Sequence, residues 1–419
     1  MNSYRMTVLL IGLLGLLPGS ARALSLDEAL VRAESAPEIQ GIAANEAATR
    51  ELEKAADALP DPRLVLSVDD YMLEGASRHR LDASKRMVGI MQTIPAGAKR
   101  EAARQKALAA NETAARQRDF VRRDVRREAT LLWLKLYFLQ RKEAVLQARI
   151  DETKRRENAT SGAFAAGGGA RPALDARLDL QMLEDALDLL RRDAELARVK
   201  LARWTGPLAP DETASGELPV WATETAQSEE EADDDAPRES GEAVTELRAS
   251  AAKIDLARAD FQQALADRKS DWSVELGWGQ DAMGDAMMMA KVGVSLPFFT
   301  ATRQTPRIEA ARHRLTAAEA EHAARRADFA RQRAELLAEE SALASLIERL
   351  ETATLPLLDK KAELAAARYA GGSGEAAELL MAREATLAAR LRAIDLTAER
   401  AAVRARLHFL RQRAGDDHE

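Results

Sequence analysis

The chain has 419 residues and no cysteine, which excludes disulfide bonds and thiolate metal sites. Its formal net charge of −7 makes it a poor candidate for nucleic-acid binding. Charged residues make up 31% of the chain and aromatic residues 4%, and Ala, Leu, Glu and Arg form long tracts. This composition is typical of a helical, coiled-coil-rich protein rather than a compact globule.

Residues 1–23 have the pattern of a secretory signal peptide. Arg5 precedes an apolar run at 8–17, and Ala21 and Ala23 supply the small residues of a cleavage site. About ten apolar residues are too few for a membrane anchor, because a spanning helix needs roughly 20. We expect the mature chain to begin at Leu24, without a cysteine for lipidation and with two arginines fewer, which moves the charge from −7 to −9.

The rest of the chain repeats itself once. A β-compatible run that ends at a proline and continues as a helix occurs at 87–104 and again at 290–312, and the two prolines, Pro95 and Pro297, lie 202 residues apart. A glycine-rich turn recurs at nearly the same spacing. The repetition predicts two similar halves, and the predicted divisions are 24–205, 206–241, 242–414 and a tail at 415–419.

Each half is predicted to contain a helix, two strands, a long helix and a returning helix. In the first half Ser25 is the expected cap of a helix at 26–57, strands follow at 64–68 and up to Ile94, and helices at 98–158 and 173–204 flank a glycine turn. In the second half the expected helices are 241–268, 303–370 and 375–412. The segment 206–241 is acidic, above all at 229–235, which predicts a solvated or disordered linker; a divalent-cation trap is the alternative.

The strands alternate between apolar and polar residues. The side chains expected to face lipid are Trp272, Val274, Leu276 and Trp278, followed on the fourth strand by Val292 and Val294, with Ala290 and Leu296 on the same side. Such alternation is typical of a transmembrane barrel. Four strands cannot close a barrel and lipid does not tolerate an open sheet edge, so the chain must oligomerise, and three copies would give 12 strands. The alternative is a soluble sheet that caps a helical bundle.

No enzyme site is visible in the sequence, so no catalytic, cofactor-binding or metal-binding residue is predicted. The glycines at 167–169 lack the Gly-Lys-Ser/Thr ending of a phosphate loop. The three methionines at 287–289 suggest a soft-metal site, but packing is favoured because consecutive strand residues point to opposite faces.

Together these motifs resemble the TolC-like outer-membrane efflux proteins. The resemblance covers essentially the whole mature chain and is carried by VGIMQTIPAGAKR, VGVSLPFF and the turn YAGGSGEAAELLMA at 369–382. The entry at 58–64 and the stretch at 92–95 look like the heavy-metal, CzcC-like and CusC-like, branch. The resemblance implies a homotrimer in the bacterial outer membrane, with a 12-stranded β-barrel continued by an α-helical barrel into the periplasm.

The resemblance also implies a passive exit duct that works with a periplasmic adaptor and an inner-membrane resistance-nodulation-division pump. Tyr369 and Glu378 match a gating tyrosine and a lumen-facing acid at the periplasmic tip, where three copies of Glu378 would form a ring that favours cations. The corresponding residues of the first half are Phe164, Asp175 and Asp179. The chain departs from some relatives at Gly374 and Met381, which stand where those carry a basic and an acidic residue.

Two other classes of protein remain open at this stage. A periplasmic adaptor also has a long helical hairpin, but it should carry a substantial continuous β-rich portion, and this sequence has four strands in two symmetric pairs. A soluble periplasmic coiled-coil scaffold would need no detergent for extraction, whereas a duct would.

Overall fold

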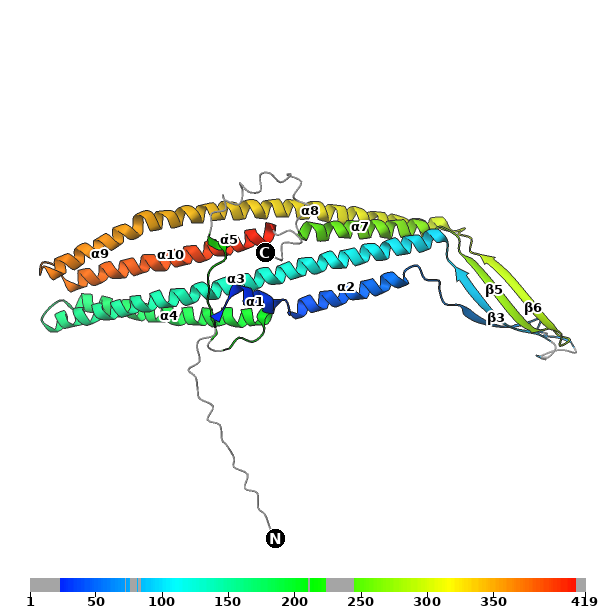
Figure 1. Cartoon of the computed structure of the whole chain (residues 1–419), viewed down its shortest axis with the longest axis horizontal. Coiled ribbons are helices and arrows are strands. Elements are labelled where there is room, and N and C mark those ends of the chain that lie inside the picture. The colour runs from blue at the N-terminus through cyan, green and yellow to red at the C-terminus, as the bar shows by residue number, and fades with distance from the viewer. Residues whose placement is uncertain are drawn as a thin grey trace, which may run out of the picture. The chain divides into compact units, whose positions relative to one another are not determined.

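The computed structural model describes residues 23–71, 73–75, 81, 84–209, 212–223 and 245–411, and helices dominate this part of the chain (Figure 1). The helices are α1 (Leu26–Ala33), α2 (Pro37–Ala55), α3 (Gly97–Ala165), α4 (Ala170–Thr205), α5 (Val220–Thr223), α7 (Thr245–Ala266), α8 (Thr300–Arg349), α9 (Leu355–Ala370) and α10 (Ala376–Arg411), with a π-helical turn at Leu350–Thr354. The strands are β1 (Ala23–Leu24), β2 (Arg63–Asp69), β3 (Lys85–Ile94), β4 (Thr213–Ala214), β5 (Trp272–Gln280) and β6 (Ala286–Val294). The predicted fold class, mainly α with a small β part, is confirmed. Within these residues, no helix is long and apolar enough to cross a membrane.

The chain divides into two compact units. The first unit comprises Met1–Ala36, Arg126–Ala226 and Glu339–Arg406, and the second comprises Pro37–Val125, Gln227–Ala338 and Leu407–Glu419. Each unit therefore takes segments from both sequence halves. The limits predicted for the repeats, the linker and the tail describe the sequence and stay a prediction.

In the second unit four helices lie side by side in the order α2, α3, α7, α8 (Figure 1). A hydrogen bond joins the two helices of each neighbouring pair. These bonds are Asn111 Nδ2 to Glu53 Oε2 at 2.8 Å, Thr113 Oγ1 to the carbonyl oxygen of Ala252 at 3.0 Å, and Ser250 Oγ to His322 Nδ1 at 2.8 Å. The strands of this unit follow the same order, β2-β3-β5-β6, and all three pairings are antiparallel. Helices and strands thus both place the first half of the chain beside the second in one layer.

The first unit also has a layer of helices, in the order α4, α3, α10 and then the end of α8 with α9. Leucines and an isoleucine fill the space between α3, α4 and α10, and this cluster consists of Leu146, Ile150, Leu183, Leu187, Leu190 and Leu391. Lys142 of α3 bonds Asp395 of α10 at 2.7 Å, and Arg400 of α10 bonds Glu340 of α8 at 2.8 Å. The long helix α3 has 69 residues and runs through both units.

The predicted helix at 26–57 is wrong because it is broken. Ser25 caps α1 as expected, accepting a hydrogen bond from the backbone N–H of Glu28 at 3.1 Å. The helix ends at Ala33, and α2 begins at Pro37. Proline has no N–H to donate inside a helix but fits the first helical position, so Pro37 ends one helix and starts the next.

The predicted helix at 303–370 is also interrupted. It begins earlier, at Thr300, and passes through the π-helical turn Leu350–Thr354 before α9 begins at Leu355. Pro356 lies in the first turn of α9. A wider turn before a proline accommodates the missing N–H and the bulk of the ring, which explains why the break occurs here.

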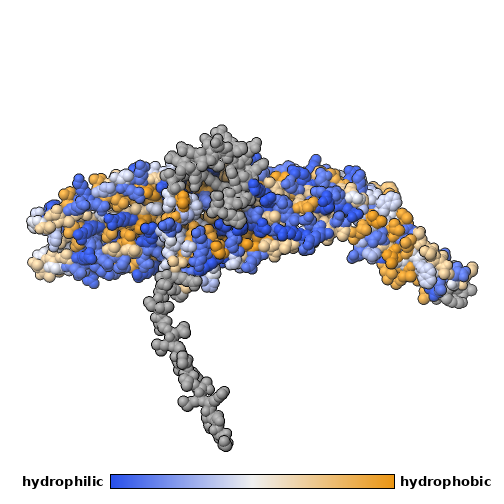
Figure 2. All heavy atoms as spheres, viewed as in Figure 1, coloured by the Kyte–Doolittle hydropathy of each residue, from blue (hydrophilic) through white to orange (hydrophobic). Residues whose placement is uncertain are grey.

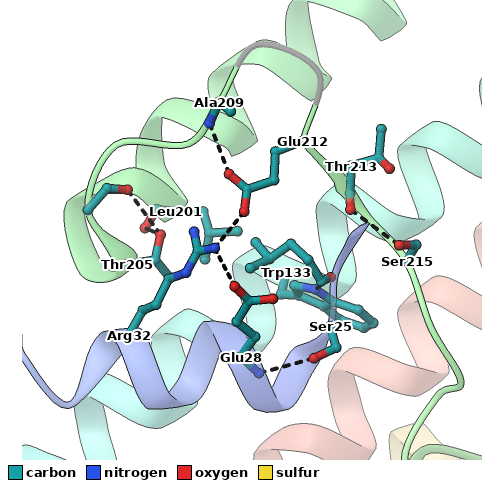
Figure 3. A network of polar contacts seen from close by, with 12 residues as sticks. Ser25, Glu28, Arg32, Trp133, Leu201, Thr205, Ala209, Glu212, Thr213 and Ser215 are labelled. Atoms are coloured by element: carbon teal, nitrogen blue, oxygen red, sulfur yellow. Dashed lines mark hydrogen bonds and ion pairs between the residues drawn. The ribbon is translucent and has the colours of Figure 1, made fainter. Parts of the chain in front are cut away.

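The segment predicted as a solvated linker is ordered at its start. Strand β4 pairs in parallel with β1, and Glu212 and Ala214 are buried. Figure 3 shows Glu212 between the guanidinium of Arg32, at 2.8 Å, and the backbone N–H of Ala209, at 2.9 Å. The acidic run at 229–235, like most of the predicted signal peptide and the tail, lies outside the described residues.

Candidate functional site

One face of the four-stranded sheet is apolar and exposed. The register places Trp272 opposite Ile94 and Val294, and Leu276 opposite Ile90. The exposed members of this face are Leu64, Leu66, Val68, Val88, Ile90, Ile94, Trp272, Val274, Leu276, Trp278, Met288, Val292 and Val294. Figure 2 shows hydrophobic residues gathered over the strands. All six residues predicted from the alternation to face lipid lie on this surface.

The fourth strand differs in extent from the residues that the alternation assigned to it. The strand begins at Ala286 rather than near Ala290, and Leu296 lies beyond its end. The strand includes the three methionines at 287–289, as their treatment as consecutive strand residues implied. The turn before it is fixed by Gly284, with φ at +90°, and by Asp281, whose carboxylate accepts the backbone N–H groups of Met283 and Asp285.

Polar side chains interrupt the apolar face only near its ends. Arg86 bonds Gln280 at 3.2 Å, and Gln92 donates to the carbonyl oxygen of Pro60 at 2.8 Å. The strands β2 and β6 are the outer members of the sheet, and within the described residues neither has a second partner strand. The apolar face therefore continues to two open edges, a combination that exposed sheets of monomeric soluble proteins avoid.

The opposite face is mixed. It carries Ser67, Thr93, Ser273, Glu275 and Lys291 together with glycines and methionines, and the Glu275 carboxylate lies 3.9 Å from the Lys291 ammonium. Glycine is required at two of these positions. A Cβ on Gly279 would lie 2.8 Å from Met87 Cα, and one on Gly89 would lie 3.1 Å from the carbonyl oxygen of Leu276.

An ion pair fixes the passage from strand to helix in the second unit. Asp271, just before β5, accepts from Lys99 Nζ of α3 at 2.8 Å and from the backbone N–H of Ala96 at 3.1 Å. Burial alone would raise the pKa of Asp271, but the Lys99 ammonium and the Ala96 N–H outweigh it, so the pKa is below its usual value. This passage is the strand-proline-helix motif that the sequence repeats.

The turn between α9 and α10 contains the predicted gating residues. Tyr369 is half exposed, and Glu378 accepts a hydrogen bond from Arg368 Nη1 at 2.8 Å. Gly372 has φ at +71°, and a Cβ on Gly374 would lie 3.0 Å from the backbone nitrogen of Tyr369. A side chain at position 374 would therefore crowd the backbone of this tight turn.

The residues predicted in the turn between α3 and α4 do not form one group. Phe164 is about half exposed, and Asp175 is an exposed residue 3.7 Å from Arg171. Asp179 instead bonds Arg156 Nη2 at 2.5 Å, and Arg156 Nε bonds Glu384 of α10 at 2.8 Å. Asp179 is thus part of a contact between helices.

Arg156 and Glu384 were not among the residues predicted from the sequence. Burial lowers the pKa of Arg156, but hydrogen bonds and charge from Asp179 and Glu384 raise it more, so the net shift is upward. Nearby, Glu152 is buried and bonds Arg383 at 3.2 Å. Glu384 and Arg383 lie 228 and 231 positions from their partners Arg156 and Glu152, and nothing local to either residue indicates the pairing.

Comparisons with known proteins agree with the geometry. Residues 240–410 match the family model described as outer membrane efflux protein. Among solved structures, the outer membrane protein VceC from Vibrio cholerae is similar at TM-score 0.73 and 15% identity, covering 92% of this chain and 95% of that one. The CmeC outer membrane channel of Campylobacter jejuni gives 0.75 and 12%, covering 92% and 85%, and CusC gives 0.69 and 16%, covering 92% and 91%. A comparison with curated protein sequences returned no match.

Proposed function

We propose that this chain is an outer membrane efflux protein and the outer-membrane duct subunit of a tripartite efflux system, a proposal that the family match at residues 240–410 supports. The observation that carries the proposal is the sheet β2-β3-β5-β6, which has an exposed apolar face and two open edges. Lipid would cover the apolar face, and pairing between β6 of one copy and β2 of the next would close the edges.

A trimer satisfies both requirements. Three copies supply 12 strands, which enclose an aqueous lumen, whereas two copies supply eight, a barrel that its own side chains fill. The helices are consistent with side-by-side association, because α2 and α8 are the outer helices of the layer in the second unit, and each lacks a helical neighbour on one side within the described residues. Side-by-side contact between the outer helices of neighbouring copies would close a helical wall that continues the barrel.

The duct would be passive and would receive its cargo from an inner-membrane resistance-nodulation-division pump through a periplasmic adaptor. The channel fold and the absence of a recognisable catalytic motif in the sequence support a role without enzymatic activity. We place the periplasmic gate at the α9–α10 and α3–α4 turns, around Tyr369, Glu378 and Phe164. Since Glu378 is paired with Arg368, a ring of three such acids would prefer cations less strongly than three unpaired ones.

Fractionation and conductance test this proposal. The chain is expressed with residues 1–23, the membranes are separated, and the outer-membrane fraction is extracted in mild detergent and sized without heating. We expect a detergent-requiring trimer that forms stable pores in a planar lipid bilayer. A water-soluble monomer or dimer would contradict the duct and would favour a sheet that caps a periplasmic helical scaffold.

A further inference from the structure

The mixed face of the sheet gathers methionines that the duct alone does not require. Met87 and Met91 lie on β3, and Met287 and Met289 lie on β6, all on the face opposite the exposed apolar one. The alternation separates the three consecutive methionines, because Met288 is 84% exposed on the apolar face while its two neighbours point to the other side. The sequence prediction of opposite faces is therefore confirmed, yet it leaves Met287 and Met289 together.

Three of these methionines, Met87, Met287 and Met289, lie on the strands that flank two glycines of β5. The Cε atoms of Met289 and Met87 lie 3.3 Å and 3.5 Å from the position that a Cβ of Gly277 would take, so the two S-methyl groups approach within about 7 Å of each other. Gly279 is paired with Met87 on one side and with Met287 on the other. The missing side chain at Gly277 thus leaves room for the S-methyl groups of Met87 and Met289 over β5, and at Gly279 the corresponding space is taken by Met87 and the carbonyl oxygen of Arg86.

The chemistry of this face fits a soft cation. The chain has no cysteine, so methionine supplies its only sulfur, and thioethers prefer Cu(I) and Ag(I) over hard divalent ions. Glu275 provides negative charge on the same face, with its Oε1 3.5 Å from the Cβ position of Gly89, although Lys291 lies 3.9 Å from the carboxylate and partly offsets it. Leucine would pack over these glycines as well as methionine does, but leucine has no atom that could bind a metal ion.

We propose that Met87, Met287 and Met289 form a thioether site for a monovalent soft cation, Cu(I) or Ag(I). The three residues alternate with glycines along one face, and their flexible side chains can converge on one ion. Because thioethers are neutral and do not take up protons near neutral pH, binding should change little between pH 6 and 8. The placement of this site in the lumen rests on the proposed function, but the binding itself does not.

Volume-conserving substitutions on the two faces test the site. The variant M87L/M287L/M289L removes the three thioethers, and the control M283L/M288L/M381L removes three exposed ones. The purified detergent-solubilised protein is titrated anaerobically with Cu(I) against a chromophoric chelator. We expect about one ion per subunit in the wild type and in the control, and binding weakened by about tenfold or more in the first variant. Equal affinity in both variants would overturn the site.

A second measurement needs no variant and guards against misfolding of the triple variant. The wild-type protein is oxidised with dilute peroxide with and without Ag(I), and methionine sulfoxide is quantified by peptide mass spectrometry. Ag(I) should lower the oxidation of Met87, Met287 and Met289 relative to the sample without Ag(I) and leave that of Met288 unchanged; the same oxidation of the three residues with and without Ag(I) would reject the site. Bilayer conductance of the same preparation separates the two ideas. A trimer that conducts but does not bind the cation would support the duct and reject the thioether site. A protein that binds the cation but forms no pores would support the site and reject the duct.

Discussion

Arg156 shows how single charges hold helices together in the first unit. Its side chain is 8% exposed and extends from α3 to Asp179 of α4 and Glu384 of α10. Removing the guanidinium leaves the Glu384 carboxylate, which is 12% exposed, without this counter-charge, and such a loss costs more than the pairing itself contributes. The exposed pair Arg171 and Asp175, at 3.7 Å, has the same chemistry without the burial.

We therefore predict that R156M destabilises the protein far more than D175N. Loss of the guanidinium should lower the free energy of unfolding by about 2–4 kcal/mol, because Glu384 then remains enclosed without its counter-charge. Asp175 is largely solvated, so its substitution should change the free energy by about 0.5 kcal/mol or less. Denaturant unfolding of the purified assembly, followed by tryptophan fluorescence, measures both. Equal midpoints for the two variants would show that the Arg156 group contributes no more than a surface pair.

At the scale of elements, Glu340 couples three helices. This buried carboxylate of α8 accepts from Arg400 and Arg404 of α10, both at 2.8 Å, and Arg404 also donates to the carbonyl oxygen of Ala222 in α5 at 3.1 Å. Burial raises the pKa of Glu340, but the two guanidinium groups outweigh it and the pKa lies below its usual value. The ionised form is thus the one that the fold stabilises.

This shift predicts an acid-dependent contribution to stability. A carboxyl group whose pKa is lower in the folded state stabilises the fold fully above its unfolded pKa, about 4.3, and loses that contribution as the pH falls through the folded value. E340Q should therefore be less stable than the wild type by about 1–3 kcal/mol at pH 7. The gap should narrow as the pH falls below about 4.3. Denaturant midpoints of both proteins at pH 7 and at pH 3 to 4 check this, and a gap independent of pH would contradict it.

The strand-proline-helix motifs and the alternation of β5 could be predicted from the sequence because both depend on neighbouring residues. Pro95 ends β3, and α3 follows at Gly97. Pro37 is a local signal of the same kind, because a proline fits the first position of a helix but not its interior, so a helix break before it is predictable from the sequence. The π-helical turn before Pro356 is harder to predict, since a proline can also be accommodated by a simple kink.

The contacts between distant helices could not be predicted. Arg156 and Glu384 are 228 positions apart, and single-sequence patterns carry no information about which exposed-looking charge meets which. The pairing of Met87 with Gly279 likewise depends on the register of β3 and β5, which the two halves of the chain set together. For the same reason the predicted tip residue Asp179 is part of a helix contact.

At the scale of the whole molecule, the proposed duct should tolerate a charged side chain on one face of the sheet and not on the other. Leu276 is 59% exposed at the centre of β5, between Ile90 and Ala290, and Ser67 points to the other face of β2. If lipid covers the apolar face, an arginine there must lie in hydrocarbon, whereas an arginine on the other face meets water. A soluble sheet would tolerate both substitutions on its exposed surfaces.

We predict that L276R prevents assembly of the duct and that S67R does not. An arginine on the lipid face near the bilayer midplane costs about 2–4 kcal/mol per copy, and a trimer carries three. Outer-membrane fractions from cells expressing each protein, run unheated, should show the trimer for the wild type and S67R and little or none for L276R. The same amount of trimer for both variants would mean that Leu276 does not face lipid, and the apolar face would then need another cover, such as a second sheet or a partner protein.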